Sequence, residues 1–332
     1  MRNQELPWTQ PEWLEEASAW VHGELERHGL RVSGPIEQPH LRPWATVLRV
    51  PTAAGAVYFK ATVPILAHEV ALTAALARWH THYTVPVLAA DLDRHWLLLA
   101  DGGTTLREII RADHDLRHWK TLLPLYAELQ IELAARLPEL LRFGTPDRRL
   151  HQLPLQYERL LDDTNALHLD QPGGLTAGEY QQLRGLSAYV TELCEQLASY
   201  HVPESLHHGD FHDANIFVRD GQFRFFDWGD SCVTHPFFSL RTVFVSMEMS
   251  LGLDEGSEPS DVLDAYLEPW TRFGSRVELH AAYKLARQLA AICSALTWHR
   301  VVSTLAPALQ MEYAEPVPAL LQEFLGLQLK AR

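Results

Sequence analysis

The alternation of apolar and polar positions predicts a helix, a hairpin, a second helix and a strand in the first hundred residues. Residues 11–30 place apolar side chains on one helical stripe, made of Trp13, Ala17, Trp20, Val21 and Leu25. Segments 45–50 and 56–61 are rich in β-branched and apolar residues and are separated by the five residues 51–55, which begin with proline and end with glycine and indicate a hairpin. A helix is expected after Pro64, and a strand over 96–100.

Beyond Gly102 and Gly103, which we interpret as a hinge, the pattern becomes mostly helical. Only the β-rich stretch 215–227 interrupts it. The sequence therefore predicts an α+β protein in which a small N-terminal antiparallel lobe (1–100) precedes a larger, mostly helical lobe (101–332). The helical stretches expected in the second lobe are 116–141, 176–201, 261–273 and 276–306.

Candidate chemistry is concentrated between His207 and Asp230. The Asp220-Gly221 pair between two alternating runs is typical of a two-residue hairpin turn, which brings Asn215 and Asp227 to the open end of one hairpin. Strict alternation would point these two side chains to opposite faces, so both must leave regular pairing to share an ion. An amide oxygen and a carboxylate suit Mg²⁺, and Asp210 could accept the proton of a substrate hydroxyl.

A second pair of candidates lies in the first lobe. Lys60 ends an apolar strand, and Glu69 falls in the middle of the apolar stripe of the next helix. A buried carboxylate without a partner costs several kcal/mol, so an inward-facing Glu69 requires a cation, and Lys60 is the nearest in sequence.

Composition narrows the class of protein. The formal charge of −14 over 332 residues disfavours a nucleic-acid partner. The first residues have no apolar leader pattern and no stretch is apolar enough for a membrane span, so we expect a cytoplasmic protein without a membrane partner. The three cysteines lie far apart in sequence without a CxxC motif, which argues against a disulfide framework or a thiolate zinc site and predicts buried, reduced thiols: Cys194, Cys232 and Cys293.

The motif His208-Gly209-Asp210, with Asn215 and then Asp227-Trp228-Gly229, resembles that of the aminoglycoside phosphotransferase and choline kinase group, relatives of the protein kinases. The resemblance runs across most of the chain and implies the two-lobed protein-kinase-like fold and phosphate transfer to a small alcohol. It implies that Asp210 is the catalytic base or orienting residue, that Asn215 and Asp227 bind magnesium, and that His208 supports the loop.

The same resemblance implies that residues 1–100 form the nucleotide-binding lobe and that 101–332 carry the catalytic loop and the acceptor site. Lys60 would contact the nucleotide phosphates, and Glu69 would hold it. Backbone groups near Leu99 and Ala100 would bind the adenine of ATP, with GTP possible. Protein kinases cover the phosphates with a glycine-rich loop, but the corresponding segment 38–46 contains no glycine, and Arg42 is a candidate phosphate contact there.

Two alternatives remain open. A kinase-like fold could bind nucleotide or a partner without catalysis. A hydrolytic metal centre could instead use imidazole and carboxylate ligands from His207, His208, Asp210 and His212. The acceptor also remains open among aminoglycosides, amino alcohols, amino acids and sugars, and the oligomeric state cannot be read from the sequence.

Overall fold

The computed structural model describes residues 6–331. The chain forms two compact units. The first comprises the residues up to 104 together with 217–229, and the second comprises 105–216 and the residues from 230 onward. The assignment of nucleotide binding to residues 1–100 and of the acceptor to 101–332 stays a prediction.

The first unit contains a five-stranded antiparallel sheet in the order β1-β2-β3-β5-β4. The predicted hairpin is present, but its turn is tighter than expected. Thr52 pairs with Gly55, so the loop holds two residues and Pro51 lies inside a strand. Two of the strands had not been predicted, β1 and β4. The strands are β1 (Glu37–Leu41), β2 (Ala45–Thr52), β3 (Gly55–Thr62), β4 (Val87–Asp91) and β5 (Trp96–Ala100).

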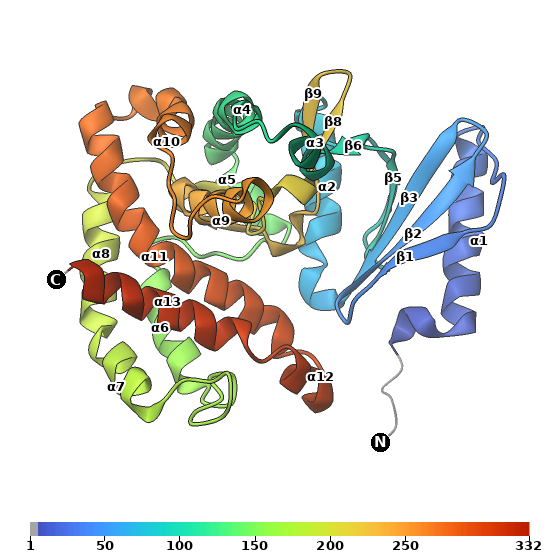
Figure 1. The fold of residues 1–332 in the computed structure, drawn as a ribbon. Coiled ribbons are helices and arrows are strands. Elements are labelled where there is room, and N and C mark those ends of the chain that lie inside the picture. Colours follow the sequence, from blue (N-terminus) through green and yellow to red (C-terminus); the bar gives the residue numbers. More distant parts are fainter. Residues whose placement is uncertain (1–5, 332) are drawn as a thin grey trace. The chain divides into compact units, whose positions relative to one another are not determined.

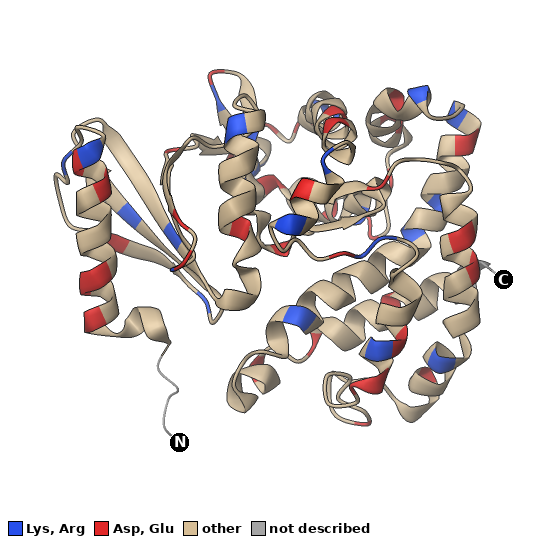
Figure 2. Ribbon diagram, turned by 180° about the vertical axis from the view of Figure 1, so that it is seen from behind, with Lys and Arg blue, Asp and Glu red and all other residues tan. Residues whose placement is uncertain are grey.

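Helix α1 (Pro11–Arg27) covers one face of this sheet (Figure 1). Its buried side chains Ala17, Val21 and Leu25 join a core with residues of β2, β3 and β5. Trp13 and Trp20 pack edge-to-face on sheet aromatics, which confirms the predicted apolar stripe. Acidic residues recur along the rest of the helix (Figure 2).

A second hairpin belongs to the first unit from Phe217 onward. It consists of β8 (Ile216–Arg219) and β9 (Gln222–Phe225), beside the short strand β6 (Thr104–Thr105). Asp220 and Gly221 have φ values of 53° and 73°, the left-handed pair that a type I′ turn requires. The predicted hairpin is therefore confirmed.

The second unit is built largely from helices, as predicted, but three of the four expected helical stretches are broken. The stretch 261–273 forms α10 followed by a 3₁₀ helix (Glu268–Arg272). The stretch 116–141 forms α4 and α5, because Pro138 lacks the N–H needed to continue α4 and instead starts the next helix. The stretch 176–201 forms α7 and α8. The helices of this unit are α3 (Leu106–Asp113), α4 (Arg117–Ala134), α5 (Leu137–Arg142), α6 (Leu153–Asp162), α7 (Ala177–Gly185), α8 (Ser187–Ala198), α9 (Ser239–Leu251), α10 (Ser260–Leu267), α11 (Arg276–Val302), α12 (Pro307–Glu312) and α13 (Pro316–Ala331).

Two short buried strands lie among these helices. Strand β7 (Ser205–His207) pairs antiparallel with β10 (Cys232–Thr234). Helix α4 packs against β7, and α11 packs against α8, α9 and α13. The chain leaves β7 directly into the segment His208–Asp210, so a rigid core element determines where that segment starts. Across residues 6–331, no helix is both long enough and apolar enough to cross a membrane.

Candidate active site

Lys60, near the end of β3, is held by two carboxylates within the first unit. Its Nζ lies 2.5 Å from Oε1 of Glu69 and 2.6 Å from Oδ1 of Asp227. Glu69 is in the first turn of α2 (His68–Trp79) and is buried, whereas 43% of the Asp227 side chain is exposed. The structure thus brings three sequence-predicted residues together around one ammonium group.

The electrostatics of this group follow from its burial. Burial acts to lower the pKa of Lys60, but the charges of Asp227 and Glu69 outweigh it and raise that pKa, so the ammonium stays charged. Burial raises the pKa of Glu69, although Lys60 opposes the shift. Among the described residues, Oε2 of Glu69 has no hydrogen-bond partner. A Cβ at Gly229 would come within 3.2 Å of it, so glycine leaves room for the carboxylate.

The two predicted magnesium ligands both leave regular strand geometry, as their joint use requires. Asp227 follows the end of β9 and has a left-handed φ of 65°. Asn215 lies in a 3₁₀ turn (Asp213–Asn215) just before β8. They belong to different compact units, and a common ion for them stays a prediction.

Asp210 lies in the second unit, with its carboxylate contacted by two side chains. Nδ2 of Asn215 donates to the Asp210 backbone oxygen at 2.9 Å and to Oδ2 at 3.2 Å. Nε2 of His212 lies 3.2 Å from the same Oδ2. Burial acts to lower the pKa of His212, but the hydrogen bond with Asp210 outweighs it and raises that pKa. The Asp210 side chain is nevertheless 42% exposed, so it is oriented and still accessible.

The predicted support residue His208 is buried, and both its ring and its backbone N–H form hydrogen bonds. Its Nδ1 accepts the N–H of Asp210 at 3.3 Å, and its own backbone N–H donates to the hydroxyl of Tyr126 at 3.2 Å. The ring of Tyr126 also stacks on Phe211, with 3.8 Å between ring centroids. Sequence reasoning missed Tyr126, because it lies on α4, more than 80 residues before the motif, and reads there as an ordinary core position.

Two further residues of this loop were assigned no direct role from the sequence. Gly209 has a φ of 85°, and a Cβ there would lie 2.1 Å from the carbonyl oxygen of Asp230, so only glycine fits. Asp213 is buried and forms an ion pair with Arg107 of α3 at 2.7 Å. The motif spacing could have indicated Gly209, but nothing in the sequence connects Arg107 with Asp213.

The predicted adenine contacts lie on β5, within the first unit. Leu99 is buried in a small apolar cluster, against which the stacked rings of Phe217 and Phe226 pack. The N–H of Ala100 donates to the carbonyl oxygen of Pro86 at 2.9 Å, so it could bind a nucleobase only by giving up this bond. The two phenylalanines were not predicted as site residues, and they add apolar surface beside Leu99.

The segment without glycine forms β1, the turn after it and the start of β2. Arg42, the candidate phosphate contact, is exposed in that turn, and its backbone N–H donates to Ala45. His40 lies on the exposed strand β1, and its pKa is lowered by partial desolvation and by the charge of Arg42. The role of Arg42 stays a prediction.

The alternative metal centre is not assembled within residues 6–331. The one cluster of three or more possible metal-ligating side chains found there is His207 with Cys232 and Cys293. His208 and His212 instead each contact Asp210.

Comparison with known proteins identifies a family. The model of a family described as "Phosphotransferase enzyme family" matches residues 23–272, which is more than half of the chain. Comparison with curated proteins gave no match.

Several solved structures share the fold at low sequence identity. An ethanolamine kinase from Plasmodium vivax is 12% identical, with a TM-score of 0.59, over 96% of this chain and 95% of that one. A choline kinase from Cryptosporidium parvum is 11% identical, with a TM-score of 0.60, over 94% and 96%. A spectinomycin phosphotransferase in complex with ADP and spectinomycin is 11% identical, with a TM-score of 0.52, over 93% and 98%.

These structures confirm the predicted α+β, protein-kinase-like fold, and the family match covers the segments that hold Lys60, Glu69, Asp210, Asn215 and Asp227. The chain belongs to the phosphotransferase enzyme family.

Proposed function

We propose that the protein transfers the γ-phosphate of ATP, or of GTP, to a hydroxyl group of a small polar molecule, with Mg²⁺ as the cofactor. The observation that carries the proposal is the position of Lys60 between Glu69 and Asp227. A lysine fixed by a buried carboxylate can present its charge to nucleotide phosphates without searching other rotamers.

Asp210 is the proposed catalytic residue. Its carboxylate is exposed enough to meet an acceptor hydroxyl, and Asn215 and His212 fix its orientation. The acceptor oxygen forms a bond to the γ-phosphorus as the bond from that phosphorus to the β–γ bridging oxygen breaks. Asp210 receives the hydroxyl proton, and the nucleoside diphosphate leaves with the electron pair of the broken bond.

The side chains assigned to magnesium fit the ion. Nδ2 of Asn215 is used in donating to Asp210, which leaves its amide oxygen to act as a ligand. Asp227 contributes a carboxylate, and oxygen ligands of these two kinds are those that Mg²⁺ prefers. When bound, the ion would neutralise charge on the nucleotide phosphates.

The nucleoside of the donor is proposed to lie at β5, against the apolar surface of Leu99, Phe217 and Phe226. A spectinomycin phosphotransferase of the same fold was solved with ADP, which supports a nucleotide as the donor here. The Ala100 carbonyl is the backbone group at this strand end that we propose for contact with the base.

The first test is thermal unfolding of the purified protein with ATP or GTP, with and without Mg²⁺. A ligand that binds only the folded state raises the melting temperature by mass action, by the equivalent of about 2.7 kcal/mol at a hundredfold excess over Kd. We expect a shift that requires both nucleotide and Mg²⁺.

The second test is nucleoside diphosphate release with a panel of hydroxyl acceptors: an aminoglycoside, choline, ethanolamine, homoserine and a hexose. Release that depends on one acceptor class, with a phosphorylated product of matching mass, supports the proposal. Nucleotide binding without turnover on any acceptor would support the catalytically silent alternative. The absence of a nucleotide-dependent shift would refute the nucleotide site.

A further inference from the structure

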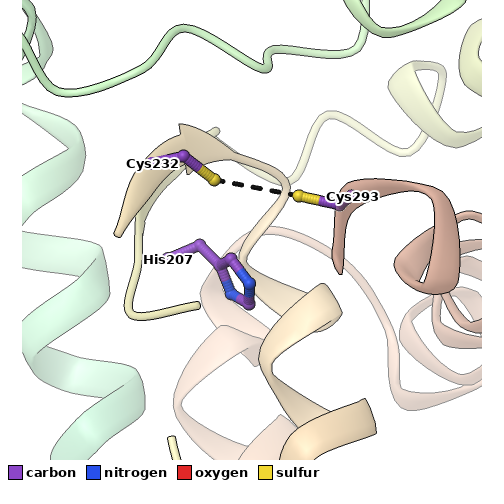
Figure 3. A group of neighbouring side chains, drawn as sticks. All are labelled: His207, Cys232 and Cys293. Carbon is purple, nitrogen blue, oxygen red and sulfur yellow. Dashed lines mark hydrogen bonds between the residues drawn. The ribbon is translucent and has the colours of Figure 1, made fainter. Parts of the chain in front are cut away.

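A cluster of three possible metal-ligating side chains lies in the second unit, apart from the residues assigned to phosphate transfer. Cys232 is on β10, Cys293 is on α11 and His207 is on β7 (Figure 3). One ligand atom of each lies within 4.8 Å of the others, and the two sulfurs are 3.8 Å apart. The cysteines are 61 residues apart in the chain, so their sequence spacing, which argued against a thiolate site, gave no sign of this contact.

The sulfur separation matches a bridged pair of thiolates better than a disulfide. A disulfide requires about 2.05 Å, so these sulfurs would have to close by well over 1 Å. Two thiolates at about 2.3 Å from one metal ion are separated by roughly 3.8–4.0 Å, for angles between tetrahedral and trigonal. The thiols therefore already stand at the distance that a common ion needs.

The ligand set is fixed by the fold. Cys232 and His207 face each other in the β7–β10 pair. Nδ1 of His207 lies 2.9 Å from Oγ of Ser239, a hydrogen bond of the kind that orients metal-ligating imidazoles. All three side chains are buried, which suits a site filled while the chain folds.

The charges around the cluster favour a monovalent metal ion over a divalent one. Arg148 is buried beside it and donates to two neutral acceptors, the carbonyl oxygen of Cys293 and the hydroxyl of Thr297. The two thiolates carry two negative charges, which one monovalent cation and this guanidinium together neutralise. A divalent ion would leave a buried positive charge. Arg300 and Asp230 act on the region from farther away with opposite charges and leave this balance unchanged.

We propose that His207, Cys232 and Cys293 form a buried, three-coordinate site for Cu(I). Thiolate and imidazole ligands suit Cu(I) and zinc, but structural zinc sites take four ligands, and the cluster offers three among residues 6–331. Binding replaces the thiol protons, which are released to solvent, and no electron is transferred. The site does not depend on the proposed phosphate transfer. It would connect β10 and α11 to β7, the strand from which the chain continues to Asp210.

The test is anaerobic titration of the reduced protein with Cu(I) against bathocuproine disulfonate, a chromogenic Cu(I) chelator. Thiol labelling after denaturation first establishes that all three cysteines are reduced. We expect one Cu(I) per chain to resist the chelator in the wild type and in Cys194→Ser, whose thiol is buried on α8 away from the cluster. Cys293→Ser should lose this ion, and unfolding without metal shows whether that variant is folded.

X-ray absorption of the Cu(I)-loaded wild type tests the site without depending on the folding of any variant. Two sulfur ligands and one nitrogen ligand in a three-coordinate ion support the site. Each of three results would overturn the proposal. Cys293→Ser keeps its copper, the wild type yields all its copper to the chelator, or the site holds a four-coordinate zinc ion that resists displacement by Cu(I).

Discussion

Lys60 and Asp227 form an ion pair of 2.6 Å although 167 residues separate them in sequence. Asp227 is assigned to magnesium and Lys60 to the nucleotide phosphates. In the proposed reaction the contact between them therefore weakens as Asp227 binds the ion and Lys60 binds the phosphates. Glu69, which is buried at 2.5 Å from the same nitrogen, keeps the lysine in place during that exchange.

Lys60→Met and Asp227→Asn should therefore differ in kind. Lys60→Met leaves Glu69 buried without a cation and should cost about 3–5 kcal/mol of unfolding free energy. Asp227→Asn alters a side chain that is 43% exposed and should cost about 1 kcal/mol or less, while it weakens Mg²⁺-dependent nucleotide binding severely. Urea unfolding and nucleotide titration measure the two effects. Equal loss of stability in both variants would contradict this division of roles.

Asp210→Asn should lower kcat by about 10²–10⁴-fold, because the amide cannot accept the hydroxyl proton. The Kd for nucleotide should change little, since Asp210 is not assigned to the nucleotide. Steady-state kinetics with the identified acceptor and calorimetric nucleotide binding check both. Asp115→Asn, at a partly exposed acid that precedes α4 and pairs with Arg117, is the matched control and should retain wild-type kinetics. Loss of nucleotide binding in Asp210→Asn would count against the role assigned here.

Tyr126→Phe tests whether the core tyrosine positions Asp210. Its hydroxyl accepts the N–H of His208, so its removal should cost about 1–3 kcal/mol of stability and lower kcat roughly tenfold with little change in KM. Tyr157→Phe is the control, since that buried hydroxyl bonds to Leu183 on α7, away from the loop. The control should lose similar stability and no activity. If kcat fell equally in the two variants, Tyr126 would have only a general packing role.

Gly209→Ala should impair turnover far more than Gly221→Ala. Both glycines have positive φ, so each alanine carries a backbone cost of about 1 kcal/mol. At Gly209 the new Cβ also meets the Asp230 carbonyl oxygen at 2.1 Å and must displace the chain next to Asp210, whereas at Gly221 it meets nothing within 4 Å. We expect at least a tenfold loss of kcat in the first variant. Equal kinetics in the two would show that the loop tolerates displacement.

The stability of the metal-free protein should fall as the pH drops below about 6.5, because of two buried histidines. Burial lowers the pKa of His207 and of His235 from 6.5 to about 3 in the folded protein. The unfolded chain therefore binds these protons first, and their contribution to stability is present above pH 6.5 and is lost progressively toward pH 3. Each histidine contributes a slope of about 1.4 kcal/mol per pH unit. His235→Asn should reduce the slope of unfolding free energy between pH 6.5 and 5, and an unchanged slope would contradict the assignment.

Much of the first unit could be predicted because periodicity and turn chemistry act locally. The apolar stripe of α1 and the Asp220-Gly221 turn each depend on neighbours within a few residues, and both were recovered. Strands β1 and β4 were missed because neither contains a fully buried position that would produce an alternating pattern. The breaks at Pro138 and Leu186 were missed because apolar periodicity continues across them.

In the candidate site, too, contacts between residues close in sequence could be predicted and contacts between distant segments could not. Lys60 and Glu69 could be paired from the sequence because one strand and the following helix fix their distance. The attachment of Lys60 to Asp227, the support from Tyr126 and the ion pair of Arg107 with Asp213 depend on contacts between distant segments. No local pattern marks those partners.

The exposed turn at Asp220 and Gly221 also offers a place for a spectroscopic probe. All three native cysteines are buried, so a single cysteine introduced at Asp220 should be the preferred target of a thiol-reactive dye. The turn lies seven residues before Asp227 and five after Asn215 in the chain. A dye attached there would sit on the one hairpin that connects both predicted metal ligands, and its emission could follow ligand binding in real time before any acceptor is known.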